Sequence, residues 1–170
     1  WRRFDKPEHV REFFALARTV SERTYQERIL DAGLPDLEEF KRQAEALAAE
    51  NRLRAYILFD GERPVSYLYC PVEEGVLIYA YLGYDPEYMK LSVGTVLQWL
   101  VLESLFAEGC FKAFDFTEGQ SDHKRLFATH QTKRANVFFI KPSLYATLVI
   151  HSQYSMDRFS GWLGATLDRL

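Results

Sequence analysis

Three short apolar segments follow one another closely between residues 53 and 82, and they limit the possible folds more than any other feature. Leu53 to Phe59 and Pro64 to Cys70 are separated by Asp60-Gly61-Glu62-Arg63, a sequence typical of a hairpin turn. Glu73-Glu74-Gly75 then precedes the third segment, Val76 to Leu82. Turns this short join antiparallel strands, so the three segments are predicted to form a meander.

Helical patterns lie on both sides of this meander. Asp5 and Pro7 indicate the start of a first helix, and Asp36 with Glu39 has the spacing of a capping box for a second. Gly83-Tyr84-Asp85-Pro86 ends the third strand, after which a helix capped by Ser92 is expected to run to Gly109. The apolar faces predicted for the three helices are Val10, Phe13, Phe14, Ala17 and Val20; Phe40, Ala44, Leu47 and Ala48; and Val93, Leu97, Leu100, Val101 and Leu105.

A fourth strand is predicted from Phe111 to Phe116, parallel to the third because a helix separates the two. A short helix over Asp122 to His130 and a fifth strand over Ala135 to Ile140 follow. Helical spacing of Met156, Phe159, Leu163, Thr166 and Leu170 predicts a last helix. This order predicts an α+β domain in which helices flank a central mixed, mostly antiparallel sheet.

The length of 170 residues favours a single domain, residues 1–170. The net charge of -3 gives no bulk attraction to nucleic acid or to an anionic membrane. A signal peptide and an apolar run of about 20 residues are both missing from the sequence, so we expect a cytoplasmic protein without a membrane span. Cys70 and Cys110 lie among apolar residues, which predicts two buried, reduced thiols, and no His or Cys spacing suggests a metal site.

Four segments carry a resemblance to a known family: residues 21–34, 53–67, 83–97 and 114–129. The last contains Asp115, Phe116, Gly119, Lys124 and Phe127 in the spacing of an Asp-Phe-x-x-Gly strand end followed by Lys and Phe. The chain resembles the GNAT (acyl-CoA N-acyltransferase) domain of the CelD/BcsL-like acetyltransferases, which are related in fold to the Fem-type aminoacyl transferases. Members of this group often have two GNAT-like halves. We expect this chain, which begins with Trp1, to be the C-terminal half of a longer protein.

The resemblance implies that acetyl-CoA or another acyl-CoA binds where the third strand meets the following helix. Backbone N–H groups at a helix start have no partner within the helix, and the helix dipole favours an anion there. The family loop has the pattern Gln/Arg-x-x-Gly-x-Gly/Ala, whereas here Leu91 and Val96 stand at its first and last positions. The predicted cofactor-binding residues are Leu82, Gly83, Lys90, Ser92, Val93, Gly94 and Thr95.

The charged residues after the fourth strand are the predicted catalytic residues. Acyl transfer to an amine requires that the amine lose a proton and that the developing oxyanion be stabilised. Asp115 or Glu118 would take the proton, directly or through water, and Lys124 would stabilise the oxyanion or hold a phosphate. Asp115 could instead pair with Lys124 or Arg125 and only close a turn.

The predicted acceptor-binding residues are Tyr25, Gln26, Tyr84 and His123. Two classes of function stay open. The first is an acyltransferase that acts on an amine or hydroxyl of a small molecule, a sugar or a cell-envelope polysaccharide precursor, with Fem-like transfer from aminoacyl-tRNA as a variant. The second is a GNAT-fold scaffold that has lost catalysis and supports an N-terminal half.

Overall fold

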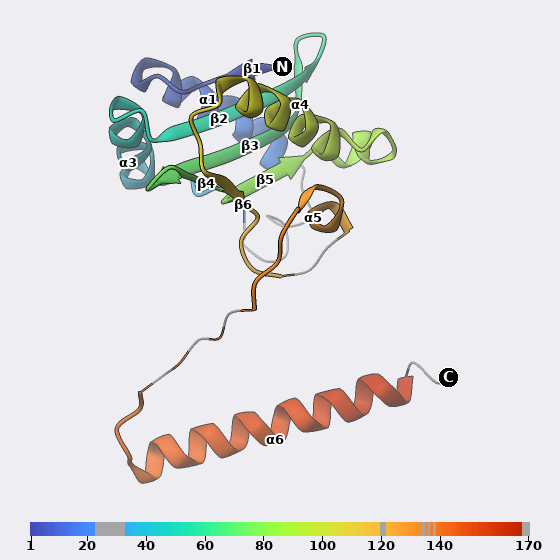
Figure 1. Cartoon of the computed structure of the whole chain (residues 1–170). Coiled ribbons are helices and arrows are strands. Elements are labelled where there is room, and N and C mark those ends of the chain that lie inside the picture. The colour runs from blue at the N-terminus through green and yellow to red at the C-terminus, as the bar shows by residue number, and fades with distance from the viewer. Residues whose placement is uncertain (23–32, 120–121, 134, 136, 138, 168–170) are drawn as a thin grey trace. The chain divides into compact units, whose positions relative to one another are not determined.

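The computed structural model of the chain describes residues 1–22, 33–119, 122–133, 135, 137 and 139–167. The chain forms two compact units, residues 1–129 and residues 130–170, which are described separately. The first unit holds the whole sheet and the helices around it, and the second holds helix α6, Leu144–Leu167 (Figure 1). Every described residue of the predicted site lies in the first unit.

The sheet of the first unit has six strands in the order β1-β2-β3-β4-β6, with β5 paired to β3 as well. All strand pairs are antiparallel except β4 with β6, which are parallel as predicted. The predicted mixed, mostly antiparallel sheet flanked by helices is therefore confirmed. The strands are β1 Arg2–Arg3, β2 Leu53–Asp60, β3 Arg63–Glu73, β4 Val76–Ile78, β5 Tyr81–Tyr84 and β6 Ala113–Asp115.

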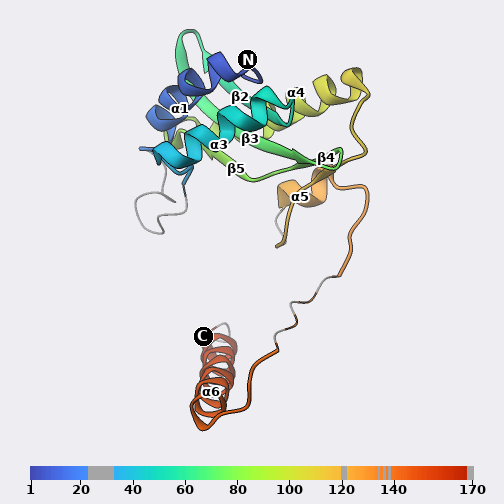
Figure 2. The ribbon, with the colours of Figure 1, turned by 90° about the vertical axis from the view of Figure 1, so that its left-hand side faces the viewer.

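Helices cover both faces of this sheet, with α1 (Pro7–Ser21) and α3 (Glu38–Ala49) on one face and α4 (Val93–Glu108) on the other (Figure 2). Each face has its own apolar core, because side chains alternate between the two faces along a strand. Under α1 and α3 the buried side chains include Phe4, Val10, Phe13, Phe14, Ala55, Ile57, Tyr67 and Tyr69. Under α4 they include Tyr56, Leu68, Cys70, Leu77, Leu97, Val101 and Leu105.

The third strand of the meander is divided into β4 and β5, although the sequence predicted one strand over Val76 to Leu82. Val72 pairs with Leu77, and Tyr69 pairs with Tyr81. Residues 70 and 71 of β3 therefore lie opposite three residues, 78 to 80, of the segment between β4 and β5. An extra residue of this kind is a β-bulge, which bends the strand and changes the direction of its side chains.

Several local predictions were wrong. The capping box does not form: α3 begins after Leu37, and Asp36 instead makes ion pairs with Arg18 and Lys41. Cys110 is exposed, because the turn after α4 lies at the surface, whereas Cys70 is buried as predicted. The described residues of the predicted fifth strand, 135, 137, 139 and 140, are not in a strand.

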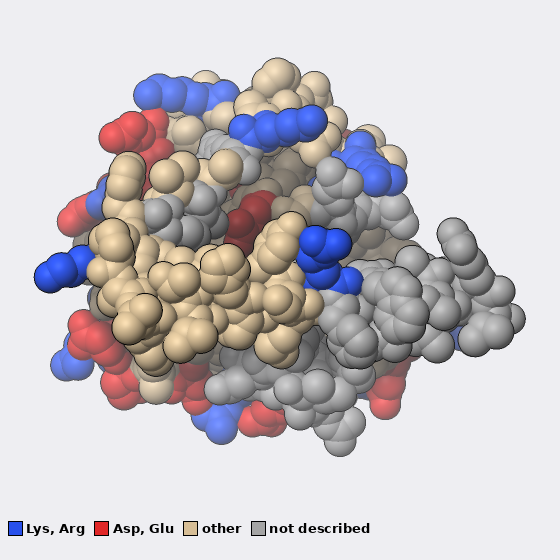
Figure 3. All heavy atoms as spheres, turned by 90° about the horizontal axis from the view of Figure 1, so that it is seen from below, with Lys and Arg blue, Asp and Glu red and all other residues tan. Residues whose placement is uncertain are grey.

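The second unit consists mainly of α6, which begins twelve residues before the first residue of its predicted apolar pattern, Met156. Ser143 caps it, since its side-chain oxygen accepts the backbone N–H of Ala146 at 3.0 Å. Its first thirteen residues, Leu144 to Met156, contain no Lys, Arg, Asp or Glu and are therefore drawn tan in Figure 3. Among the described residues, no helix combines the length and the apolarity needed to cross a lipid bilayer.

Candidate active site

The edge of β5 that faces away from β3 has no strand partner among the described residues. Asp85 donates its backbone N–H to the carbonyl of Val65 at 2.8 Å, which fixes which β5 residues bond to β3. In an antiparallel pair every second residue bonds to the neighbouring strand. Gly83 therefore bonds toward β3, while the peptide groups of Leu82 and Tyr84 point outward from the free edge.

Helix α4 begins beside β5, and its first backbone N–H groups have no partner within the helix. The helix ladder starts with the N–H of Val96, which donates to the carbonyl of Ser92 at 3.0 Å. The amides of Val93, Gly94 and Thr95 come before that bond and have no partner within the helix. Ser92 has a left-handed backbone with φ 52° and makes no side-chain capping bond. The start of α4 is therefore a set of N–H donors at the positive end of the helix dipole.

Gly94 holds the start of α4 against β5. A Cβ atom at this position would lie 3.3 Å from a methyl carbon of Leu82 and 3.6 Å from the ring of Tyr84. Such a contact is tighter than ordinary van der Waals packing, so the absence of a side chain lets the helix and the strand approach. The structure thus places Gly94 against Leu82, which the sequence predicted with it for the cofactor, and against Tyr84, which it predicted for the acceptor.

The short 3-10 helix η1, Pro86–Leu91, connects β5 to α4 and ends next to these donors. Asp85 begins it, because its carboxylate accepts the N–H of Glu87 at 3.1 Å and forms an ion pair with Arg63 at 2.6 Å. Lys90 lies in its last turn with an exposed side chain. Leu91 is exposed as well, so the departure from the family loop is at the surface.

Gly83 is required by packing with Tyr67. A Cβ atom on Gly83 would lie 2.3 Å from the Tyr67 ring, which is closer than any real contact allows. The Gly83 carbonyl also accepts the hydroxyl of Ser66 at 2.9 Å. Its role as a cofactor contact stays a prediction, but its place in the core has a sufficient structural cause.

The β4–β6 ladder ends at Asp115, at the bulge, beyond which β5 pairs with β3. The N–H of Tyr79 donates to the carbonyl of Asp115 at 2.9 Å, beyond the last pair of the ladder, Ile78 with Asp115. The Asp115 side chain is half-buried and accepts the N–H of Thr117 at 2.8 Å. This bond closes a turn in which Thr117 has a left-handed φ of 61°. Asp115 therefore has a structural role, which leaves its predicted catalytic role as a prediction.

Three aromatic rings pack together at the end of the β4–β6 ladder. The ring centroid of Tyr79 lies 6.2 Å from that of Phe114 and 5.9 Å from that of Phe116. Burial raises the pKa of the Tyr79 phenol, so this group keeps its proton at neutral pH. No separate pattern in the sequence marks Tyr79, which stands inside a run that resembles an ordinary strand.

The basic residue predicted for the site comes from helix α5, Asp122–Phe127. The Lys124 ammonium donates to the backbone carbonyl of Glu118 at 2.5 Å, and Glu118 has an exposed side chain. His123 lies in α5, but its side chain is not described. Tyr25 and Gln26 lie outside the described residues.

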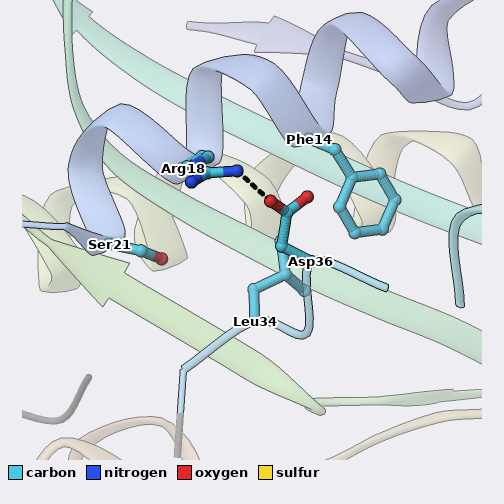
Figure 4. Close-up of a pocket in the computed structure, with 5 residues that line it drawn as sticks. All are labelled: Phe14, Arg18, Ser21, Leu34 and Asp36. Atoms are coloured by element: carbon cyan, nitrogen blue, oxygen red, sulfur yellow. Dashed lines mark hydrogen bonds and ion pairs between the residues drawn. The ribbon is translucent and has the colours of Figure 1, made fainter. Parts of the chain in front are cut away.

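Two hollows lie beside α1, and no described residue of the predicted site lines either of them. The smaller has a volume of about 10 Å³, enough for one water molecule, and is crossed by the Arg18–Asp36 ion pair (Figure 4). The larger has a volume of about 310 Å³ and is lined by Leu16, Thr19, Arg63 and Pro64. Within the described part of the chain, no group of three His, Cys, Asp or Glu side chains could hold a metal ion.

Comparison with known proteins identifies the family. The family described as "Acetyltransferase (GNAT) domain" matches residues 2–125, nearly three quarters of the chain. The chain therefore belongs to the GNAT acetyltransferases, and the residues matched include all of β1 to β6 and α4. No curated protein matches the sequence.

Solved structures share the fold at low sequence identity. An aminoglycoside acetyltransferase from an uncultured soil metagenomic sample, in complex with sisomicin, has a TM-score of 0.55 and 14% identity, over 83% of this chain and 95% of its own. AAC(6')-Iy in complex with the bisubstrate analogue CoA-S-monomethyl-acetylneamine has a TM-score of 0.53 and 13% identity, over 84% and 97%. A possible acetyltransferase from Clostridium difficile 630 has a TM-score of 0.55 and 9% identity, over 81% of this chain and 95% of its own.

Proposed function

We propose that this acetyltransferase binds acetyl-CoA, or another short acyl-CoA, along the free edge of β5 and transfers the acyl group to an amine or hydroxyl of a small molecule or sugar precursor. The observation that carries the proposal is the contact, made at Gly94, between the uncapped start of α4 and β5, the strand whose outer edge has no partner among the described residues. The AAC(6')-Iy structure, which holds a CoA-based bisubstrate analogue, supports the same class of donor.

The pyrophosphate would rest on the amides of Val93, Gly94 and Thr95. These donors point along the helix axis, and the dipole of a 16-residue helix adds positive potential at their position. Lys90 and the hydroxyl of Ser92 lie at the same helix start and would add charge and a further donor. The exposed Leu91 and Val96 add neither, so backbone groups supply most of the binding.

The pantetheine arm would extend along β5 toward the bulge. Its two amides can pair with the outward peptide groups of Leu82 and Tyr84, as an added strand would. From Tyr84 back to Tyr79 is a distance of about 17 Å at 3.3 Å per residue, which is roughly the extended length of the arm between pyrophosphate and sulfur. The thioester would then lie beyond the end of the β4–β6 ladder, close to Asp115.

At that position the acceptor amine attacks the thioester carbon, the carbon–sulfur bond breaks, and the CoA thiolate leaves. Asp115 would accept the proton of the amine, directly or through a water molecule, while keeping the Thr117 turn closed. Lys124 and Glu118 lie on the loop after β6, where a cation and a second carboxylate can serve the oxyanion or the acceptor. His123 would border the acceptor. Tyr84, exposed beside Gly94, lies at the pyrophosphate end of the proposed arm, so its contact with the acceptor stays a prediction from the sequence alone.

The test is acetyl-CoA-dependent release of free thiol with a panel of amines and amino sugars, for the wild type and Asp115→Asn. The amide oxygen of Asn still accepts the Thr117 N–H, so the fold should hold while kcat falls by about 10²- to 10⁴-fold. Glu73→Gln, which removes an exposed carboxylate at the end of β3, should leave both the fold and kcat unchanged. Asp115→Asn with full activity would remove Asp115 from the chemistry.

A non-catalytic scaffold is the second candidate, and the apolar Leu91 and Val96 at polar or small positions of the family loop favour it. It predicts that wild-type protein neither binds CoA nor releases thiol with any acceptor. Fem-like transfer from aminoacyl-tRNA, the CelD/BcsL-like subgroup and an N-terminal partner half belong to the same set of open proposals. A protein that binds aminoacyl-tRNA and leaves CoA unbound would favour the Fem-like variant.

A further inference from the structure

Trp99 is a large aromatic side chain that the core does not use. It is 58% exposed, although tryptophan normally buries most of its surface. It lies on α4 four residues after Thr95, so the two side chains share one face of the helix, one turn apart. An exposed indole therefore stands about 6 Å along the helix from the proposed pyrophosphate donors.

Phe127 of α5 supports this indole. The two ring centroids lie 6.3 Å apart at an interplanar angle of 51°, an edge-type contact that fixes the orientation of the Trp99 ring and leaves the rest of its surface open. The contact joins α4 to α5, whose Lys124 and Arg125 supply positive charge next to Phe127. An aromatic surface bordered by cations suits a nucleobase that carries phosphate groups.

We propose that Trp99 stacks on the adenine base of the CoA donor, with Phe127 as the positioning residue that holds the indole. This inference rests on the proposed function, because the pyrophosphate at the start of α4 determines where the nucleotide begins. The pantetheine arm leaves the pyrophosphate along β5, so the nucleoside must extend in the other direction over the surface of α4. Thr95 and Trp99 mark the face of α4 that turns toward α5.

The experiment measures by calorimetry the Kd of two probes, CoA and 4′-phosphopantetheine, which has the arm but no nucleoside. Stacking on an aromatic side chain contributes about 1–3 kcal/mol per base, so Trp99→Ala should weaken CoA binding by about 5- to 150-fold. The same variant should leave 4′-phosphopantetheine binding unchanged. Trp99→Phe should keep part of the CoA affinity, because a smaller ring still stacks.

Phe106→Ala is the matched control. Phe106 is another exposed aromatic side chain of α4, 82% exposed and seven residues beyond Trp99, and its removal should change neither Kd. If Trp99→Ala leaves CoA binding unchanged, or weakens both probes equally, the inference is wrong. If wild-type protein binds neither probe, the proposed function fails instead, and the two failures are thus distinguishable.

Discussion

Single residues at the start of α4 decide how closely the donor can approach. Gly94→Ala would place a methyl group 3.3 Å from Leu82, on the surface where the arm is proposed to enter. Alanine favours a helix over glycine by about 1 kcal/mol, which offsets the tight contact, so the free energy of unfolding should change by less than about 1 kcal/mol. The Kd for acetyl-CoA should rise by about tenfold. Val96→Ala, in the same turn but exposed, should leave it unchanged, and equal effects would contradict this geometry.

Gly83 tests the opposite case, a glycine whose role is packing. Gly83→Ala places a Cβ atom 2.3 Å from the Tyr67 ring, so urea unfolding should show a loss of about 1–3 kcal/mol from overpacking. Tyr67→Ala removes the ring, so adding Gly83→Ala to that variant should cost much less unfolding free energy than Gly83→Ala costs in the wild type. Additive losses in the double variant would show that the two side chains do not compete for the same space.

At the scale of elements, a part-buried ion pair ties the end of α4 to β2. The Arg54 side chain is only 2% exposed and pairs with Glu108 at 2.6 Å, while Arg3 beside β2 contacts the same carboxylate at 3.1 Å. Arg54 also donates to the side chain of Asn51 and to the carbonyl of Leu53, so loss of the carboxylate removes only part of its compensation. Glu108→Ala should therefore cost about 1–3 kcal/mol of unfolding free energy in urea, and an unchanged free energy would show that the pair does not stabilise the fold.

The same pair predicts a pH dependence. The hydrogen bond from Arg54 lowers the pKa of Glu108 below its ordinary value of 4.5. A carboxylate with a lowered folded pKa stabilises the protein above the unfolded value, and this stabilisation is lost as pH falls through the folded value. Between pH 5 and pH 3 the wild type should lose more thermal stability than Glu108→Gln. Equal losses of thermal stability in the two proteins would contradict a role of Glu108 in this pH dependence.

The sequence predicted those elements whose signals are local. The apolar spacing from Val10 to Val20 and the turn at Asp60-Gly61 were sufficient for α1 and for the β2–β3 hairpin. By contrast, β1 has two residues and exists only through pairing with β2, and the bulge after Ile78 depends on β3 and β6. Neither has a pattern of its own. Pro142-Ser143, however, is a helix-start signal that could have located α6.

The residues of the candidate site also divide into those with a local sequence signal and those without one. Gly94 and Ser92 could be found because a glycine and a hydroxyl at a helix start have a recognised use with anions. Tyr79 and Trp99 could not, because one is hidden in a strand pattern and the other in a helix pattern. The position of Tyr79 follows from its packing on Phe116 at the end of the β4–β6 ladder, and that of Trp99 from its contact with α5. Both are tertiary features.

For the whole molecule, the proposed donor site belongs to the first compact unit alone. Residues 1–129 contain β5, η1, α4 and Asp115, whereas α6 belongs to the second unit. A fragment ending at Thr129 should therefore keep the Kd of the full chain for CoA within about twofold, as measured by calorimetry, if burial of its two cores suffices for folding. A folded fragment, checked by circular dichroism, that has lost CoA binding would place part of the site in the second unit.

The most direct test of the account is thermal unfolding of the full chain with and without about 1 mM acetyl-CoA, because a ligand at 100 times its Kd stabilises by about 2.7 kcal/mol. For a chain of this size the account predicts a rise in Tm of roughly 5–11 °C. Acetate and ADP at the same concentration should not reproduce it. An unchanged Tm with acetyl-CoA would contradict the proposal that the free edge of β5 and the start of α4 bind an acyl-CoA donor.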